Sequence, residues 1–221
     1  MRNNWARAWL TAAGSIVLAV IVANSRERWL LNVEQPVVDF LLDGADTSVW
    51  ERATVLSSWE LIIPGTILLA LVALWLEVRV AFAIVTTTVF AYAVTGMIGS
   101  LVARVGPAGE TSGTFPSLDV VQASVFWGLV VMMFWWVGSP KLLWHIVLEL
   151  SIVVTLLVAI RGIAVGEFWP SDAVGGLLVG VLTLITTAIV FEANPAKFPT
   201  RMPWKRRPAA KPVAVESTLE V

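Results

Sequence analysis

The segment from Arg161 to Asp172, RGIAVGEFWPSD, holds an arginine and two carboxylates, Glu167 and Asp172, close together. Arginine can bind a phosphate or another anion, and a carboxylate can serve as a base or a nucleophile. The segment lies between two long apolar runs and contains a Trp-Pro break, so one hydrophobic helix is expected to end here and another to begin. We therefore predict a polar site at a membrane face.

The composition indicates an integral membrane protein. The chain has 221 residues, of which 57% are hydrophobic and 14% charged, and its mean hydropathy is +0.81. Soluble domains carry about a quarter charged residues. A net charge of −1 argues against a nucleic-acid partner, which would need a basic surface. Because the chain has no cysteine, disulfides, thiolate metal sites and cysteine nucleophiles are excluded.

Apolar segments delimited by charged residues, Pro and Gly predict an all-α bundle of six transmembrane helices. A rise of ~1.5 Å per residue lets segments of this length cross a ~30 Å hydrocarbon layer. The first segment could also be a cleaved signal peptide, because its start is basic and its apolar core is short. An uncleaved span is favoured, since it makes the number of spans even. The predicted spans are 6–24, 57–76, 79–103, 118–137, 142–161 and 172–192.

The lysines and arginines predict that both termini are cytoplasmic, in a plasma membrane that we take to be a bacterial inner membrane. In this orientation residues 25–56 form the longest outer connection. Its apolar residues recur at helical spacing among acids, which indicates an amphipathic helix on the membrane surface. Residues 194–221 are basic and proline-rich, and predict a disordered cytoplasmic tail that contacts anionic lipids.

Two other polar pieces should lie on the same side as the segment 161–172. Arg104 ends the third span, in the sequence Arg104-Val-Gly-Pro107. The loop before the fourth span ends in Phe115-Pro-Ser-Leu-Asp119. In the predicted orientation all three pieces are outside, so their charged residues are expected to converge.

The three pieces resemble, in chain order, the motifs of the type 2 phosphatidic acid phosphatase family. In the first motif Arg104 matches a phosphate-binding arginine, but Met97 stands where the family has a lysine. The second motif is Pro-Ser-Gly-His in the family. Here Ser117 matches the serine, whereas Leu118 replaces the glycine and Asp119 replaces the histidine that protonates the leaving alcohol.

The third motif has lost its nucleophilic histidine. Asp172 matches the aspartate that steadies this histidine in the family. Counting back from Asp172 places Phe168 at the nucleophile position, whereas counting forward from Arg161 places Glu167 there. The first count is favoured, because Trp-Pro-Ser-Asp is the denser match.

The resemblance implies a six-helix bundle that acts on lipid phosphates, such as phosphatidate or polyprenyl pyrophosphate carriers, without a metal or other cofactor. It implies a phosphate site made by Arg104, Ser117 and Arg161. Three carboxylates remain as candidate catalytic groups: Asp119, Glu167 and Asp172.

The chain has a single histidine, His145, which begins the fifth span on the predicted inner side. Phosphohistidine chemistry at an outer site is therefore excluded by the sequence. We interpret His145 as an interfacial side chain beside Trp144.

The charged residues also have simpler interpretations. Asp119 and Asp172 could cap the helices that begin beside them, and Arg104 and Arg161 could extend to the membrane surface. Capping explains neither arginine, so a cluster at one membrane face is favoured.

Two features lie within the spans. Glu149 falls inside the fifth span, where a lone carboxylate is costly. It should face the bundle interior, be protonated or bind Ser151, Thr155 or Gln122, either as a structural hydrogen bond or on a proton or lipid pathway. The spacing Gly176-x-x-x-Gly180 predicts close helix packing, within the monomer rather than in a dimer.

Three functions follow. The first is a hydrolytically silent protein that binds a phosphorylated lipid at its outer face through Arg104 and Arg161. The second is a lipid phosphatase or transferase that uses carboxylates. The third is a structural subunit whose charges cap helices and contact a partner membrane protein.

Overall fold

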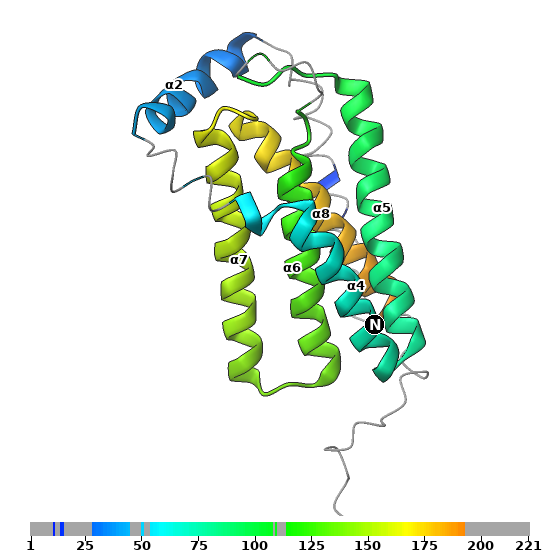
Figure 1. The fold of residues 1–221 in the computed structure, drawn as a ribbon. Coiled ribbons are helices and arrows are strands. Elements are labelled where there is room, and N and C mark those ends of the chain that lie inside the picture. Colours follow the sequence, from blue (N-terminus) through cyan, green and yellow to red (C-terminus); the bar gives the residue numbers. More distant parts are fainter. Residues whose placement is uncertain are drawn as a thin grey trace, which may run out of the picture.

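The computed structural model describes residues 11, 14–15, 28–44, 50, 54–107, 109 and 114–192. Within these ranges the chain is helical and has no strand. Five long helices run side by side, and α2 lies across one end of the bundle (Figure 1). The elements are α2 (Arg28–Gly44), the 3-10 helix η1 (Thr54–Leu56), α4 (Trp59–Leu76), α5 (Val78–Val102), α6 (Leu118–Val137), α7 (Lys141–Ala164) and α8 (Pro170–Glu192).

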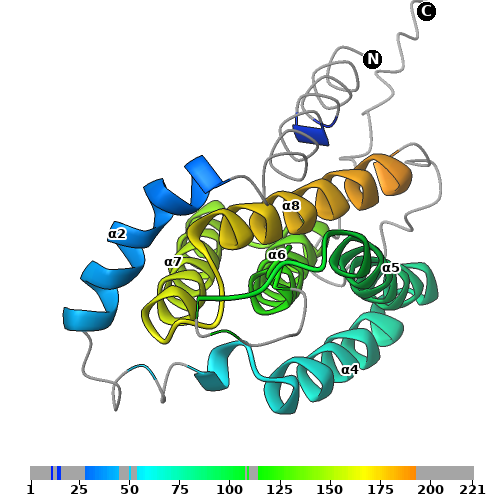
Figure 2. The ribbon, with the colours of Figure 1, turned by 90° about the horizontal axis from the view of Figure 1, so that it is seen from above.

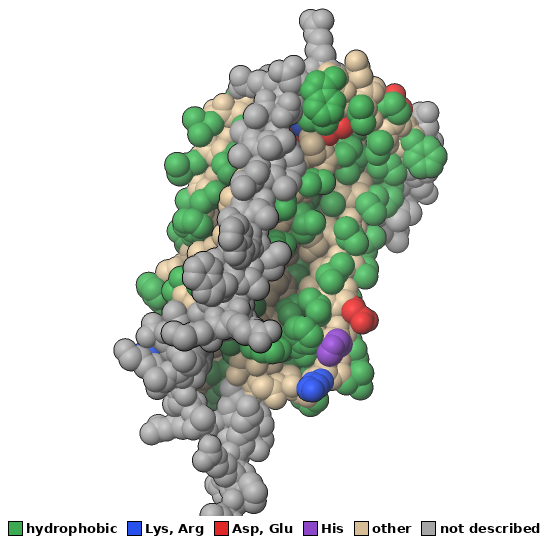
Figure 3. All heavy atoms as spheres, turned by 180° about the vertical axis from the view of Figure 1, so that it is seen from behind, with side chains coloured by type: hydrophobic (Ala, Val, Ile, Leu, Met, Phe, Trp, Pro, Cys, Tyr) green, Lys and Arg blue, Asp and Glu red, His purple; other side chains and the backbone are tan. Residues whose placement is uncertain are grey.

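Five of these helices, α4 to α8, are long and apolar enough to cross a membrane. They coincide with the second to sixth predicted spans to within about one helical turn. The predicted first span, 6–24, and the predicted tail, 194–221, lie almost entirely outside the described residues. Hydrophobic side chains cover most of the described face in Figure 3, as expected for a surface that lies against lipid.

Helix α6 is the centre of the bundle. Seen from above, it lies among α4, α5, α7 and α8 (Figure 2). Its apolar side chains pack in two directions, because the helix is hydrophobic all round. Val121, Val125 and Leu129 join a core with α5 and α8, whereas Val120 and Ala123 join a core with α2 and α7.

The turns of the chain have local causes. Ser117 caps α6, and its hydroxyl accepts a hydrogen bond from the Val120 amide at 3.4 Å. Gly138 ends α6 in the left-handed conformation, with φ 72°, which glycine adopts without strain. Gly166, also with φ 72°, turns the chain after α7. This turn brings the residues before α8 back over the end of α7.

Helix α2 packs on the end of the bundle through one face only. Val38 is fully buried and belongs to the core with α7 and α8. On its other faces Trp29, Val33 and Phe40 are 56%, 63% and 77% exposed. The predicted helix is therefore present, and its exposed apolar side chains suit a position at a membrane surface.

The two glycines of the predicted packing face lie against α6 of the same chain. A Cβ on Gly176 would lie 2.7 Å from the backbone oxygen of Ser117, and one on Gly180 would lie 1.8 Å from the Ser124 hydroxyl oxygen. Helices α6 and α8 can approach this closely only because both positions lack a side chain.

We expect Gly176→Ala to destabilise the protein by about 1–3 kcal/mol, because the added methyl group meets a backbone carbonyl that cannot rotate away. Gly96 on α5 is a matched control, since nothing lies within 4 Å of its Cβ position. Gly96→Ala should keep or raise stability through its helix propensity, by up to ~1 kcal/mol. Thermal unfolding of the purified variants in detergent measures both changes in stability. Equal stability of the two variants would contradict the packing described for α6 and α8.

Candidate functional site

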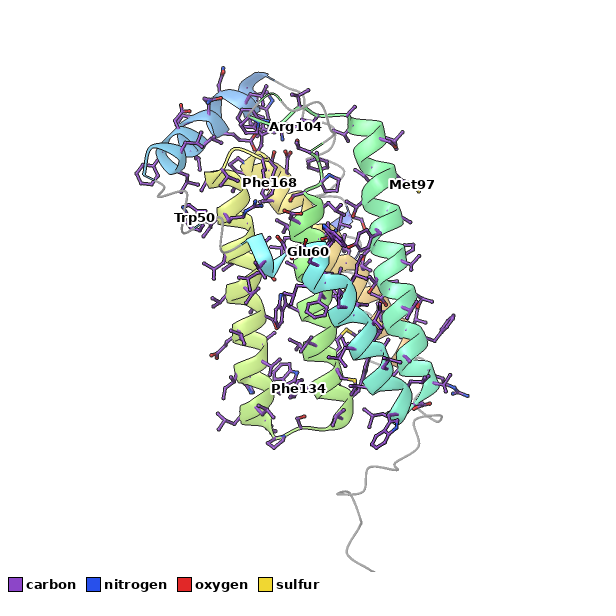
Figure 4. All side chains as sticks on the ribbon, viewed as in Figure 1. Trp50, Glu60, Met97, Arg104, Phe134 and Phe168 are labelled. Atoms are coloured by element: carbon purple, nitrogen blue, oxygen red, sulfur yellow. The ribbon has the colours of Figure 1, made fainter. Side chains whose placement is uncertain are left out.

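The predicted charged residues gather at the end of the bundle where α5 ends and α6 and α8 begin, below α2. Figure 4 shows Arg104 and Phe168 at this end. Backbone hydrogen bonds join the three pieces: the Thr114 amide donates to the Arg104 carbonyl at 2.9 Å, and the Ser117 amide donates to the Asp172 carbonyl at 3.0 Å. The convergence expected from the sequence is therefore present.

Arg104 is the centre of a buried ion-pair network. Its Nη1 lies 2.6 Å from Asp172 Oδ1 and 2.5 Å from Ser171 Oγ, and its Nη2 lies 2.6 Å from Glu34 Oε2. The side chains of Arg104, Asp172 and Glu34 are only 4%, 0% and 5% exposed. The guanidinium also lies over the ring of Trp169, at 5.5 Å from its centroid. The positive charge of Arg104 is thus already paired with two carboxylates of the same chain.

The two carboxylates of this network are satisfied on their other sides as well. Asp172 Oδ2 accepts hydrogen bonds from the Thr114 hydroxyl at 2.7 Å and the Trp169 amide at 3.0 Å. The Ser171 amide donates to Glu34 Oε1 at 2.7 Å. The network therefore connects α2, the segment after α5 and the start of α8. We name it the Arg104 network.

Sequence reasoning missed Glu34. It is one of the acids of the predicted amphipathic helix in residues 25–56, and it was not predicted to belong to the site, yet it is 4% exposed. The sequence contained an indication that Glu34 is buried, because Glu34 and Val38 are four residues apart and so share one helix face. Val38 is fully buried.

Arg161, near the end of α7, forms a second and more open cluster. It makes a two-pronged pair with Glu167, with Nη1 to Oε2 at 2.5 Å and Nη2 to Oε1 at 2.6 Å. Its Nη1 also lies 3.3 Å from Asp119 Oδ2. The Arg161 side chain is 9% exposed, but those of Glu167 and Asp119 are 38% and 36% exposed. We name these three residues the Arg161 cluster.

The charges of the two clusters do not balance. Two arginines face four carboxylates, Glu34, Asp119, Glu167 and Asp172, so the formal charge of these six side chains is −2. In addition, the Nε atoms of Arg104 and Arg161 are buried and have no hydrogen-bond partner among the described residues. Within the described part of the chain, no group of three or more His, Asp or Glu residues is arranged to hold a metal ion.

Phe168, which the favoured count along the third motif matches to the family's nucleophile, has a buried ring. Phe168 is 5% exposed, and its ring lies directly against Gly162, where a Cβ would come within 2.0 Å of it. The neighbouring Glu167 turns towards Arg161. A phenyl ring offers no atom that can attack phosphorus.

Other motif positions face away from the charged residues or serve in helix capping. Met97, at the position of the family's lysine, is 64% exposed on the outer side of α5 (Figure 4). Leu118 is 42% exposed. Ser117, rather than Asp119, caps α6. Asp172 has the expected capping role, since it accepts from the amide of Trp169, the residue that precedes α8, and it also binds Arg104, which the sequence did not predict.

Two polar residues lie away from this end. His145 is near the start of α7, and its ring lies 4.9 Å from that of Trp144, as its interfacial interpretation predicts. The prediction for Glu149 was wrong in part: it is exposed on α7 and does not face the bundle interior. Ser151 and Thr155, its proposed partners, donate instead to backbone carbonyls. Helical Ser and Thr side chains satisfy themselves in this way, so they leave no donor for Glu149.

Comparison with known proteins identifies the fold. No protein-family profile and no curated protein sequence matches the chain. A solved structure matches it: the crystal structure of the first transmembrane PAP2 type phosphatidylglycerolphosphate phosphatase from Bacillus subtilis. The TM-score is 0.76 at 14% identity, and the match covers 83% of this chain and 96% of the other. The chain is therefore a helical membrane protein with the fold of PAP2-type membrane phosphatases.

Proposed function

We propose that this protein binds the phosphate of a phosphorylated lipid, such as phosphatidate or a polyprenyl phosphate, at Arg161 and does not hydrolyse it. The observation that carries the proposal is the two-pronged pair between Arg161 and Glu167. The same planar arrangement of N–H groups binds a carboxylate or a phosphate with two parallel hydrogen bonds. Glu167 thus holds the place that an anionic ligand would take.

Arg161 is better suited to an incoming phosphate than Arg104. The carboxylates that bind Arg161 are more than one-third exposed, so they can turn into water when a competing anion arrives. The carboxylates that bind Arg104 are at most 5% exposed, and removing them from the arginine would leave charges buried without a partner. In this proposal Arg104 fixes the architecture, and Arg161 makes the exchangeable contact.

The groups at this end support the proposed absence of hydrolysis. The residue at the nucleophile position is a buried phenylalanine, and the single histidine of the chain lies near the start of α7, away from this end. Asp172 is 0% exposed and holds three donors, so it cannot reach a lipid. Asp119 and Glu167 are accessible, but both are paired with Arg161, and in this proposal they compete with the phosphate for the arginine and do not attack it.

The negative charge at this end sets the expected strength of binding. A phosphate that approaches Arg161 meets a cluster with a formal charge of −1, so it must displace Glu167 to gain a hydrogen bond. We therefore expect weak binding in solution, which the high local concentration of lipid in a membrane offsets. The distribution of lysine and arginine supports a site on the outer face of a bacterial inner membrane, with cytoplasmic termini.

The purified full-length protein should release no phosphate from a panel of lipid phosphates, and phosphatidate should raise its melting temperature. We expect Arg161→Gln to abolish the rise, because the bidentate contact is lost. Arg79→Gln is a matched control, since Arg79 is exposed near the start of α5, away from this cluster. Phosphate release that disappears in Glu167→Gln would favour a carboxylate-dependent enzyme. An unchanged rise in Arg161→Gln would refute binding at Arg161.

A second candidate, a structural subunit of a membrane complex, is favoured by Glu149. This carboxylate is exposed on α7 within a helix that can span the membrane, and it has no ion pair with a described residue. Ionisable groups in such positions usually meet a partner. If this is the function, phosphatidate should leave the melting temperature unchanged in both the native protein and Arg161→Gln.

A further inference from the structure

We propose that two copies of this protein associate in the membrane through the side of α7 that faces away from the bundle, where Glu149 of each copy pairs with His145 of the other. The contact surface is made by Leu142, His145, Glu149 and Ile152, which we name the α7 stripe. All four residues are exposed, and the two apolar members, Leu142 and Ile152, are 74% and 51% exposed. The inference is independent of the lipid site proposed at Arg161, which lies near the other end of α7.

Glu149 is the residue that requires a partner. It is exposed about 12 Å from the start of a helix that can span a membrane, which places it inside a ~30 Å hydrocarbon layer. Among the described residues it has no ion-pair or hydrogen-bond partner, and His145, one turn away on the same helix, does not bind it. A carboxylate in lipid is costly unless it meets a polar group of a neighbouring helix.

The bundle cannot supply that group, because it lies on the opposite side of α7. Figure 2 shows α7 at the edge of the bundle, next to α6. Val158 follows Glu149 by nine residues, which is half a turn around the helix, and it is fully buried. The Ser151 hydroxyl, on the same buried side, donates to the Trp127 carbonyl of α6 at 3.3 Å. The α7 stripe therefore points into the lipid.

The spacing of the α7 stripe suits a second copy of the same helix. Its members follow one another at intervals of three, four and three residues, which is the seam by which two parallel helices pack. Two copies are parallel because they share one topology in the membrane. In such a pair each side chain inserts between residues one turn apart on the facing helix, so Glu149 lies beside His145 of the second copy. Two-fold symmetry makes this contact twice.

His145 has a ring nitrogen available for the contact. Its Nδ1 lies 2.6 Å from the Lys141 carbonyl, which can only accept, so Nδ1 carries a proton. A protonated Glu149 can donate to Nε2 of a neutral His145, and a cationic His145 can donate from Nε2 to an ionised Glu149. One proton shared between the two groups therefore satisfies both. In Figure 3 the single histidine lies at the edge of the molecule beside an acidic side chain.

Helix α2 limits the extent of the contact. It lies across one end of the bundle (Figure 1), and its Val38 packs in one core with Val158 of α7. The α7 stripe ends at Ile152, before this level. Two α7 helices that cross near Glu149 and diverge towards α2 meet this limit. A different membrane protein would need an imidazole or a similar group at the depth of Glu149, whereas a second copy supplies it by symmetry.

The first test is disulfide cross-linking in membranes, which is specific because the chain has no cysteine of its own. Ile152→Cys places a thiol on the α7 stripe. Leu150→Cys is the matched control, because Leu150 is 52% exposed at nearly the same depth but lies on another side of α7. We expect a several-fold higher yield of cross-linked dimer for Ile152→Cys. Equal yields for the two variants would show random collisions and would overturn the inference.

The second test is the dimer dissociation constant of the full-length protein in detergent micelles, from sedimentation equilibrium. Glu149→Leu and His145→Leu should each weaken the dimer about tenfold. Glu149→Leu should fold, since leucine suits a position that faces lipid, and Glu149→Gln should weaken the dimer less because it keeps a hydrogen-bonding group. Arg161→Gln should leave the constant unchanged, which separates this surface from the proposed lipid site. A native protein that stays monomeric, or an unchanged constant in both leucine variants, would refute the pairing and leave Glu149 to a different partner.

Discussion

Arg104→Met should destabilise the protein by about 3–5 kcal/mol, more than any other substitution considered. Methionine fills a similar volume, but it leaves Glu34 and Asp172 with no cation in a place where their side chains are at most 5% exposed. Two carboxylates that are buried and unpaired repel each other and cannot be solvated. The measurement is the melting temperature of the detergent-solubilised protein, and a large fall is the expected result.

Arg161→Met is the matched control for this prediction. Its partners Asp119 and Glu167 are more than one-third exposed, so water can solvate them, and we expect a loss of only ~1 kcal/mol or less. Adding Glu34→Gln and Asp172→Asn to Arg104→Met should recover much of the loss, because the unpaired charges are removed. Equal losses for the two arginine variants would contradict the distinction between a closed Arg104 network and an open Arg161 cluster.

Glu167→Gln should strengthen the binding of phosphatidate about tenfold to a hundredfold, whereas Arg161→Gln should abolish it. Glutamine removes the charge that competes with phosphate for both terminal nitrogens of Arg161. The dissociation constant of the purified protein for phosphatidate in mixed micelles measures the change.

Asp119→Asn tests the same idea with a weaker competitor. Asp119 contacts only one nitrogen of Arg161, at 3.3 Å, so we expect a smaller gain in affinity than for Glu167→Gln. If Glu167→Gln weakens the binding of phosphatidate, Glu167 supports the site and does not compete with the ligand, and the proposed exchange is wrong.

The helices and the position of the charged residues could be predicted from the sequence. Long apolar runs specify membrane-spanning helices because backbone groups in lipid must bond internally. Arg104, Asp119 and Asp172 stand at the ends of such runs, so an alternating topology places them together. The Phe115–Asp119 and Trp169–Asp172 sequences then gave the likeness to a phosphatase fold, and the structural match agrees with it.

The partners of the arginines could not be predicted in the same way. Arg161 and Glu167 are six residues apart, a spacing that does not bring side chains together on a helix. They meet because α7 ends at Ala164 and the chain turns back at Gly166. Glu34 reaches Arg104 from a helix that is distant in sequence. Such contacts depend on tertiary packing, which the spacing of motifs does not specify.

Phe168 and Glu149 illustrate two other limits. Counting along the third motif placed either Phe168, which was favoured, or Glu167 at the nucleophile position. The sequence did not show that the Phe168 ring is buried against Gly162 while the Glu167 side chain points to Arg161. Glu149 was expected to avoid the lipid-facing side because an exposed carboxylate there is costly. Its exposure on α7 contradicts only the position in the bundle interior, which was one of the possibilities left open.

The most direct test is to locate the phosphorus atom in an experimental structure of the protein with bound phosphatidate. Our account predicts that the phosphate oxygens lie within hydrogen-bond distance of both terminal nitrogens of Arg161, that Glu167 has turned into solvent, and that Arg104 keeps its bonds to Glu34 and Asp172. A phosphate held elsewhere, with the pair between Arg161 and Glu167 intact, would contradict it.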